Sequence, residues 1–216
     1  MKTLKKILIT AGPTREMLDP VRFLSNLSTG HMGYTIARVA SSQKYRVTLV
    51  SGPTPLKPPA KVKFVAVVSP QEMKKACERL FPRHDVLIMT AAVCDFTPQH
   101  RHAQKIHRTK TTQLLLKRTP DIVAGLARRK GKRLVIGFSL ETQNWLENAA
   151  RKLRRKKLDG IVANYYTPRH IPFGGRKINV AFLDKRGRAK LLRGQSKDQV
   201  ARHLLSWIKQ WEGFKK

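Results

Sequence analysis

Short apolar runs alternate with amphipathic segments along the chain as far as residue 163. Apolar, β-branched runs bounded by Gly, Pro or polar residues predict buried strands. Apolar residues spaced three and four apart predict helices between them. The expected strands are 6–10, 46–51, 62–68, 85–90, 134–138 and 161–163, and the expected helices are 31–43, 70–81, 120–129 and 144–157. This alternation predicts a mostly parallel sheet with helices on both faces and right-handed crossovers.

The pattern changes in the last quarter of the chain. Residues 178–183 and 189–192 flank Arg186-Gly-Arg188, which predicts a β-hairpin, and a final helix should begin at Ser196. Two segments show no regular period, namely a polar stretch from Gly12 to Gly30 and a basic stretch over 96–113, and we expect a long loop and a mobile excursion there. Without a repeat or a linker, residues 1–216 should form a single Rossmann-like α/β domain with a C-terminal β-hairpin.

Composition narrows the class of protein. The chain has 216 residues, of which 41% are hydrophobic, a globular composition. Its longest apolar runs are too short to span a bilayer, and the stretch Ile7–Ile9 is too short for the core of a signal peptide. We therefore expect a cytoplasmic protein that does not bind membranes, whose two cysteines are reduced thiols.

The charge is unusual, because 45 Lys and Arg stand against 13 Asp and Glu, a formal net charge of +32. Such a balance favours anionic partners. One candidate function for the chain is therefore a basic nucleic-acid-binding module. Aromatic residues make up only 7% of the chain, and no nucleic-acid-binding motif is recognisable. We therefore expect nucleic acid to bind only non-specifically. The other reading of the charge is a basic, solvated surface with no specific partner.

Ligands of open parallel sheets bind beyond the carboxyl ends of the strands, here after Thr10, Thr90, Phe138 and Ala163. Neither a Gly-x-Gly-x-x-Gly motif nor a Walker A loop is present. However, residues Ser28-Thr29-Gly30 precede a predicted helix, where hydroxyl and backbone N–H groups suit a phosphate. Ordinary helix N-capping is the alternative interpretation of these three residues.

A set of motifs in this chain resembles the signature of phosphopantothenoylcysteine synthetases. The motifs occur in that family's order over almost the whole chain. They are Thr10-Ala-Gly-Pro-Thr-Arg-Glu16, Asp19-Pro-Val-Arg-Phe-Leu-Ser-Asn26, Ser28-Thr-Gly-His-Met-Gly33, Thr48-Leu-Val-Ser-Gly-Pro53, Ala91-Ala-Val-Cys-Asp95, Gln104-Lys-Ile106, Thr119-Pro-Asp-Ile-Val123, Gly137-Phe-Ser-Leu-Glu-Thr142 and Asp159-Gly-Ile-Val-Ala-Asn164.

The resemblance implies a ligase of coenzyme A biosynthesis that joins 4′-phosphopantothenate to cysteine. The substrate carboxylate would attack the α-phosphate of CTP, releasing pyrophosphate, and the amine of cysteine would then displace CMP. The resemblance implies CTP rather than ATP. We expect Mg²⁺ as cofactor, because a triphosphate carries more charge than a few lysines neutralise. The motifs identify no metal ligand.

The resemblance also assigns residues. The asparagine that holds the acyl intermediate matches Asn26, with Arg22 nearby, and the lysine that contacts the triphosphate matches Lys105. Ser28, Thr29 and Gly30 would hold the substrate phosphate. The nucleotide-binding positions would be Thr90, Ala91, Asp95, Lys105, Pro120, Asp121, Ile122, Val123, Phe138, Lys152 and Lys156. Lys152 and Lys156 are four residues apart, so one helix face can present both, although a solvated surface pair is the simpler interpretation.

Members of this family are typically dimeric, and the hairpin 178–192 is the expected dimerisation element. A flavin-dependent decarboxylase precedes the synthetase in many relatives, whereas the motifs here begin at Thr10. We therefore expect a stand-alone synthetase and a separate phosphopantothenoylcysteine decarboxylase. Thr29, His31 and His107 depart from the family's usual residues, which leaves a nucleotide-binding homologue without turnover as an alternative.

Overall fold

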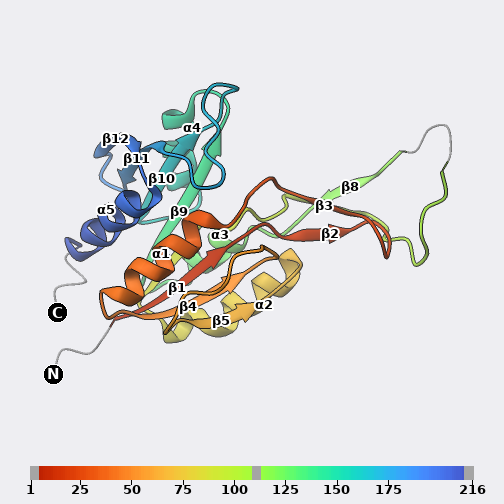
Figure 1. Cartoon of the computed structure of the whole chain (residues 1–216), viewed down its shortest axis with the longest axis horizontal. Helices are drawn as coiled ribbons and strands as arrows, with labels where there is room; N and C mark the ends of the chain where they lie inside the picture. The colour runs from red at the N-terminus through yellow and green to blue at the C-terminus, as the bar shows by residue number, and fades with distance from the viewer. Residues whose placement is uncertain (1–4, 109–112, 212–216) are drawn as a thin grey trace.

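The computed structural model describes residues 5–108 and 113–211, and an eight-stranded sheet runs through it (Figure 1). The strand order is β12-β11-β10-β9-β6-β1-β4-β5. All neighbours are parallel except β10–β11 and β11–β12, which are antiparallel. The strands are β1 (Lys6–Ala11), β4 (Arg46–Ser51), β5 (Lys63–Ala66), β6 (Val86–Met89), β9 (Leu134–Glu141), β10 (Gly160–Tyr165), β11 (Ile178–Asp184) and β12 (Ala189–Gln195). The predicted fold class, including the C-terminal hairpin, is confirmed.

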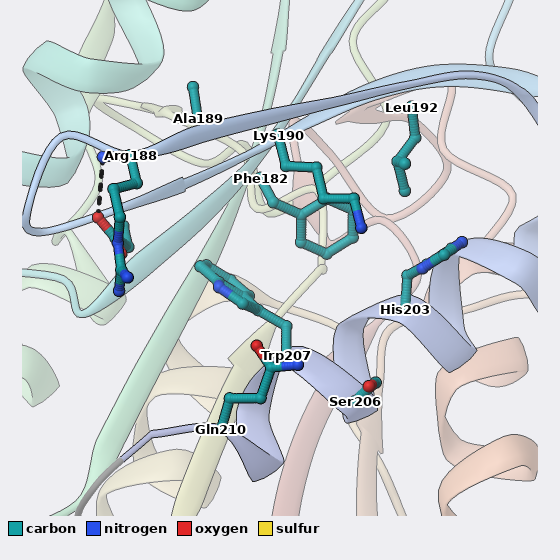
Figure 2. Close-up of a pocket in the computed structure, with 10 residues that line it drawn as sticks. Phe182, Arg188, Ala189, Lys190, Leu192, His203, Ser206, Trp207 and Gln210 are labelled. Carbon is teal, nitrogen blue, oxygen red and sulfur yellow. Dashed lines mark hydrogen bonds and ion pairs between the residues drawn. The ribbon is translucent and has the colours of Figure 1, made fainter.

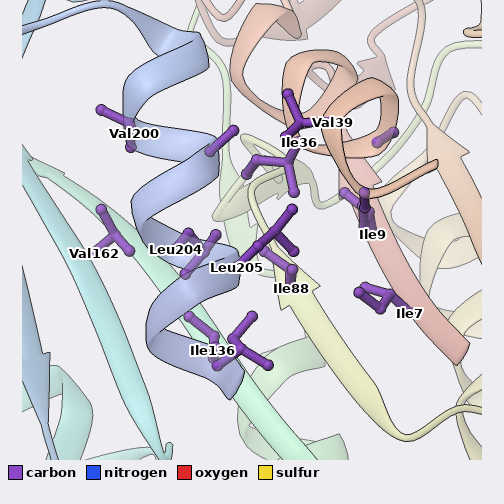
Figure 3. Close-up of a cluster of buried hydrophobic side chains, with 14 of the residues drawn as sticks. Ile7, Ile9, Ile36, Val39, Ile88, Ile136, Val162, Val200, Leu204 and Leu205 are labelled. Atoms are coloured by element: carbon purple, nitrogen blue, oxygen red, sulfur yellow. The ribbon is translucent and has the colours of Figure 1, made fainter. Parts of the chain in front are cut away.

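Helices cover both faces of this sheet. The helices α1 (His31–Ser42) and α5 (Lys197–Lys209) cover one face. The opposite face is covered by α2 (Pro70–Leu80), α3 (Ile122–Arg128) and α4 (Trp145–Arg155), and a short 3-10 turn, η1 (Phe81–Arg83), follows α2. Figure 3 shows the first layer, where Ile36 of α1 and Leu205 of α5 lie over Ile88 of the sheet. No helix in the described part of the chain is both long and apolar enough to cross a membrane.

Capping residues fix where the helices begin. Ser196 and Gln199 form a reciprocal capping box at α5, so the helix predicted to open at Ser196 begins at the next residue. The predicted start of α3 at Pro120 is wrong, because the side chain of Asp121 accepts a hydrogen bond from the Ala124 N–H at 3.1 Å. Asp121 is therefore the N-cap, and Pro120 lies outside the helix.

Two small hairpins extend from the carboxyl edge of the sheet. They consist of β2 (Arg15–Met17) with β3 (Phe23–Ser25) and β7 (Phe96–Pro98) with β8 (Leu116–Arg118). We call residues 15–25, 96–108 and 113–118 the arm; it projects from the main sheet in Figure 1. The prediction of a long loop before Gly30 is thus wrong, and the excursion predicted over 96–113 begins with a strand. Residues 109–112 lie outside the described residues.

The order of strands creates a topological switch point. The chain runs from β1 outward to β4 and β5 and then returns to β6 on the other side of β1. Crossovers on the two sides of such a point lead to opposite faces, which opens a crevice at the carboxyl ends of β1 and β6. This is the edge at which the sequence predicts a ligand.

Candidate active site at the carboxyl edge of the sheet

A cleft of about 890 Å³ opens at this edge on the α3 and α4 side, and we refer to it as the main cleft. A volume of this size is typical of small-molecule sites. It is lined by residues that follow β3 and β6, by the start of α3, by the end of β9 and by α4. Its polar and charged lining includes Asn26, Ser28, Asp95, Arg118, Asp121, Ser139, Lys152, Arg155 and Lys156.

A second pocket of about 220 Å³ lies at the N-terminus of α1, and we refer to it as the α1 pocket. It is bounded by residues 28–33, by the ends of β6, β9 and β10, and by Pro172, Phe173 and Lys197. Seven residues line both spaces, so the two adjoin: Ser28, Ala91, Ala92, Phe138, Ser139, Leu140 and Phe173. A ligand that occupies both would extend across the end of β9.

Hydrogen bonds fasten together the loops that form the floor of the cleft. The carbonyl of Ala92 accepts from the backbone N–H of Thr14 at 3.2 Å and from the side-chain Nδ2 of Asn26 at 3.0 Å. The Oγ1 of Thr14, which is fully buried, accepts from the N–H of Cys94 at 2.9 Å. Asn26 is therefore held in the cleft by the same loop that carries Asp95.

The N-terminus of α1 has no side-chain cap. Its N-cap, Gly30, has a φ of 78°, a left-handed conformation that favours glycine. The hydroxyl oxygens of Ser28 and Thr29 accept from the N–H groups of Gly30 (3.4 Å) and Gly174 (3.2 Å), which leaves the O–H group of each hydroxyl able to donate. The N–H groups of the first turn of α1, for which the described residues offer no acceptor, are further donors for a phosphate.

Most of the predicted nucleotide-binding residues meet in this region. Asp95, Pro120, Asp121, Ile122, Val123, Lys152 and Lys156 line the main cleft, Ala91 and Phe138 line both spaces, and Thr90 lines the α1 pocket. Thr29 and Gly30 also line the α1 pocket, and Ser28 lines both.

The two lysines of α4 face the cleft but are not free cations. The Nζ of Lys152 lies 2.5 Å from Glu141, and that of Lys156 lies 3.0 Å from Asp121. Both residues line the main cleft, and each ammonium group is paired with a carboxylate. A triphosphate would have to share them with these carboxylates.

Arg22 and Lys105 do not line either space in a single chain. Both belong to the arm and lie near the buried carboxylate of Asp19, which accepts from the N–H groups of Val21 (2.7 Å), Arg22 (2.7 Å) and Ile106 (3.1 Å). Burial alone would raise the pKa of Asp19, but these backbone hydrogen bonds and the charge of Arg22 lower it. Asp19 thus joins the segment of Arg22 to the segment of Lys105.

Several residues of the site escaped the sequence interpretation. Arg118 and Arg155 line the main cleft, and Lys197 lines the α1 pocket. Arg155 lies within the basic run 151–157, of which the motif resemblance marks only Lys152 and Lys156. Phe173 belongs to the loop between β10 and β11, which carries no signal of its own.

A third cavity lies between the hairpin β11–β12 and the C-terminal half of α5 (Figure 2). It is lined by Phe182 and Trp207, with Arg188, Lys190 and His203 around them. Trp207 packs against Gly160, the first residue of β10, so this cavity lies toward the amino end of the parallel strands. None of the predicted site residues lines it, and the carboxyl-edge spaces remain the candidate site.

The fold and the cleft together define a Rossmann-like α/β domain whose candidate site adjoins the N-terminus of its first helix. Comparison with known families is specific. A profile of the DNA/pantothenate metabolism flavoprotein C-terminal domain matches residues 3–211. The chain belongs to this family.

Individual relatives agree with this assignment. The chain is 40% identical over 206 residues to the coenzyme A biosynthesis bifunctional protein CoaBC of Bacillus subtilis, covering 94% of this chain and 51% of the relative. It is 45% identical over 163 residues to the protein of the same name from Escherichia coli, covering 73% of this chain and 40% of the relative. The chain thus spans about half the length of the curated relatives it matches, or less.

Solved structures share the fold. The C-terminal domain of a CoaBC protein superposes with a TM-score of 0.81 at 42% identity, covering 95% of this chain and 94% of that chain. A DNA/pantothenate metabolism flavoprotein from Streptococcus pneumoniae superposes with a TM-score of 0.84 at 25% identity, covering 95% and 98%. A Cab2 mutant in complex with phosphopantothenate-cysteine, at 18% identity and a TM-score of 0.78, shows likeness of fold alone.

Proposed function

We propose that this chain is a phosphopantothenate–cysteine ligase that proceeds through an acyl-cytidylate formed from CTP. The observation that carries the proposal is the main cleft, where most of the residues matched to nucleotide contacts converge beside Asn26 and next to the α1 pocket. Relatives at 40% identity are named for coenzyme A biosynthesis, which supports the pathway.

The proposed reaction needs no nucleophile from the protein. The carboxylate oxygen of phosphopantothenate attacks the α-phosphorus of CTP and pyrophosphate leaves; the amine of cysteine then attacks the acyl carbon and CMP leaves. The cysteines of the chain do not compete, since burial raises the pKa of Cys77 to about 12 and raises that of the Cys94 thiol. What the site must supply is position and charge stabilisation.

Asn26 has the position to act on the acyl group. One N–H of its amide is used on the Ala92 carbonyl at 3.0 Å, which fixes the side chain at the cleft wall. The second N–H and the carbonyl oxygen have no partner among the described residues, and we propose that they contact the ligand. We assign Asn26 the role of donor to the acyl oxygen of the intermediate.

Mg²⁺ fits the donors of the main cleft. Magnesium in nucleotide sites is held by one or two carboxylates together with substrate phosphates. Asp121 is engaged by the α3 backbone and by Lys156, whereas Asp95 is exposed and accepts no side-chain hydrogen bond from the described residues. Asp95 is therefore the carboxylate that would hold the ion, which would neutralise charge on the triphosphate.

We propose in addition that the site is completed by a second copy of the chain. Lys105 is matched to a contact with the triphosphate and Arg22 is expected near the acyl intermediate, but both belong to the arm and line neither space of their own chain. The arm and the residues beside it also expose apolar side chains, among them Leu27 at 80% and Leu115 at 66%. Exposed apolar surface of this kind marks an interface. The hairpin expected to dimerise has a buried strand, β11, and an exposed edge strand, β12, so it stays an alternative contact. We place the homodimer contact on the arm because the arm carries Lys105 and Arg22.

Mixing two inactive variants tests this arrangement. Lys105→Ala retains the cleft and loses the arm lysine, and Asn26→Asp does the reverse. If arms are exchanged, a mixed dimer has one complete site, and an equal mixture should recover about one quarter of wild-type activity. Activity that stays at the level of the separate variants would show that Lys105 serves its own cleft.

The proposed ligase activity is tested by pyrophosphate release from CTP with 4′-phosphopantothenate, with and without cysteine. Sustained release that requires cysteine is expected, with specificity for CTP above that for ATP. A chain that binds CTP without release would be a nucleotide-binding homologue without turnover. Equal or better use of ATP would overturn the nucleotide assignment.

A further inference from the structure

Lys197, the first residue of α5, is buried although it carries a charge. Only 8% of the residue is exposed, and it lines the α1 pocket. Its Nζ donates to the carbonyls of Pro172 at 3.1 Å and Arg176 at 3.2 Å. No carboxylate of the described residues pairs with it. A lysine has three N–H donors, so one remains without a partner in this part of the chain.

Burial of an uncompensated ammonium is unfavourable, and buried lysines without a partner are rare. Desolvation accordingly lowers the pKa of Lys197. A group that is costly to bury and lies in a pocket is more readily explained by a ligand than by packing. An anion in the pocket would supply the missing compensation.

The rest of the α1 pocket has the same polarity. No Asp or Glu lines it. The first turn of α1 contains no acidic residue, has no side-chain cap, and presents N–H groups without an acceptor among the described residues. Helix N-termini of this kind attract phosphoryl groups. The helix end and the ammonium of Lys197 are independent positive features of one small cavity.

Lys197 also fastens the loop between β10 and β11 over this pocket. Its two carbonyl partners flank Gly174, whose N–H donates to the Oγ1 of Thr29 at 3.2 Å. Pro172 and Phe173 of the same loop line the pocket. A phosphoryl group bound in the α1 pocket would contact the ammonium of Lys197, which also holds the loop between β10 and β11 over the pocket.

We propose that Lys197 is a ligand-binding residue that, with the N-terminus of α1, holds a phosphoryl group in the α1 pocket. This inference rests on the proposed function for the identity of the ligand. The phosphoryl group belongs either to the phosphate ester of phosphopantothenate or to the triphosphate of CTP, and the pocket adjoins the main cleft closely enough for either source.

The test compares Lys197→Gln with wild type by isothermal titration calorimetry. Glutamine keeps N–H donors for the two loop carbonyls but removes the charge. The matched control is Arg202→Gln, which removes one charge from the exposed side of the same helix. Each protein is titrated with phosphopantothenate, pantothenate, CTP and cytidine. Loss of a charged hydrogen-bond partner of a phosphate should weaken the affinity about tenfold or more.

The expected result is a loss for one phosphorylated ligand in Lys197→Gln, absent from Arg202→Gln and absent for the same ligand without its phosphate. The ligand that loses affinity identifies the source of the phosphoryl group. Unchanged affinity for both phosphorylated ligands would overturn the proposal. An equal loss for the phosphate-free compounds would also overturn it, because Lys197 would then act only through the loop.

Two further measurements keep the test decisive. If Lys197→Gln does not fold, a crystal structure of wild type with each ligand replaces it. A phosphoryl oxygen about 3 Å from the Nζ of Lys197 is expected, and phosphates located elsewhere in both complexes would refute the role. If wild type binds neither ligand, the proposed ligase function fails. Inorganic pyrophosphate titrated into wild type and Lys197→Gln then tests the pocket by itself, and equal affinities would refute it.

Discussion

Gly33, in the first turn of α1, connects the packing of the fold to the geometry of the site. A Cβ at this position would lie 2.5 Å from the Cβ of Ala11 and 2.5 Å from the Oγ1 of Thr90. That hydroxyl donates to the carbonyl of Thr10 at 2.6 Å. The absence of a side chain therefore allows the start of α1 to rest directly on the carboxyl ends of β1 and β6.

The substitution Gly33→Ala should destabilise the protein. Non-bonded carbons are most stable at about 3.5–4.0 Å, so the helix or the sheet must move by about 1 Å. Overpacking of this kind costs about 1–3 kcal/mol, partly offset by up to about 1 kcal/mol of helix propensity gained from alanine. The net loss should lie between about 0 and 3 kcal/mol, and at about 2–4 °C per kcal/mol for a domain of this size the melting temperature should fall by up to about 12 °C.

Gly125 in α3 is the matched control, because a Cβ there meets nothing within 4 Å. Gly125→Ala should keep or raise the melting temperature, by up to about 4 °C. Calorimetric melting of both variants is the assay, and phosphopantothenate and CTP affinities should fall in Gly33→Ala only. A Gly33→Ala protein that melts at or above wild type with unchanged affinities would refute this account of how the helix is seated.

Four other outcomes are expected. Asn26→Asp should form acyl-cytidylate and release a stoichiometric burst of pyrophosphate but transfer the acyl group poorly, because a negative charge replaces an amide beside an anionic intermediate; normal turnover with cysteine would make Asn26 a loop residue only. Lys105→Ala should slow pyrophosphate release about 10²–10³-fold with an unchanged melting temperature, and an unaltered rate would remove Lys105 from the mechanism. Asp19→Asn should be less stable than wild type at neutral pH. Since the pKa of Asp19 is lowered in the folded protein, the difference in unfolding free energy between the two proteins should shrink as pH falls from about 4 through that pKa. A difference that does not change with pH would contradict this. Nucleic acid should bind without sequence preference and weaken steeply with added salt, whereas selective binding at physiological salt would favour a nucleic-acid-binding role.

The main sheet could be predicted because its strands are fully buried and its helices amphipathic. Residues such as Ile7, Leu8 and Ile9 are all buried, so the strand is a continuous apolar run. The arm could not be predicted in this way, since β2, β3, β7 and β8 have three residues each. So short a strand shows no period of two in the sequence.

The candidate site, too, could be predicted only in part. Motif resemblance named Asn26 and Asp95, which line the main cleft, and Lys105, which belongs to the arm and lines neither space. Periodicity put Lys152 and Lys156 on one helix face but could not reveal Glu141 and Asp121, which come from other elements. Lys197 gave no signal either, because a lysine after a helix N-cap is normally exposed and only tertiary packing buries it.

The most direct test of the central claim follows one oxygen atom. If the carboxylate of phosphopantothenate attacks the α-phosphorus of CTP, an oxygen of that carboxylate is bonded to phosphorus in the intermediate and leaves with CMP. Turnover of carboxylate-labelled phosphopantothenate with CTP and cysteine should therefore transfer one labelled oxygen to the phosphate of CMP, as read by mass spectrometry. CMP without label, or label recovered in CDP or inorganic phosphate, would contradict an acyl-cytidylate.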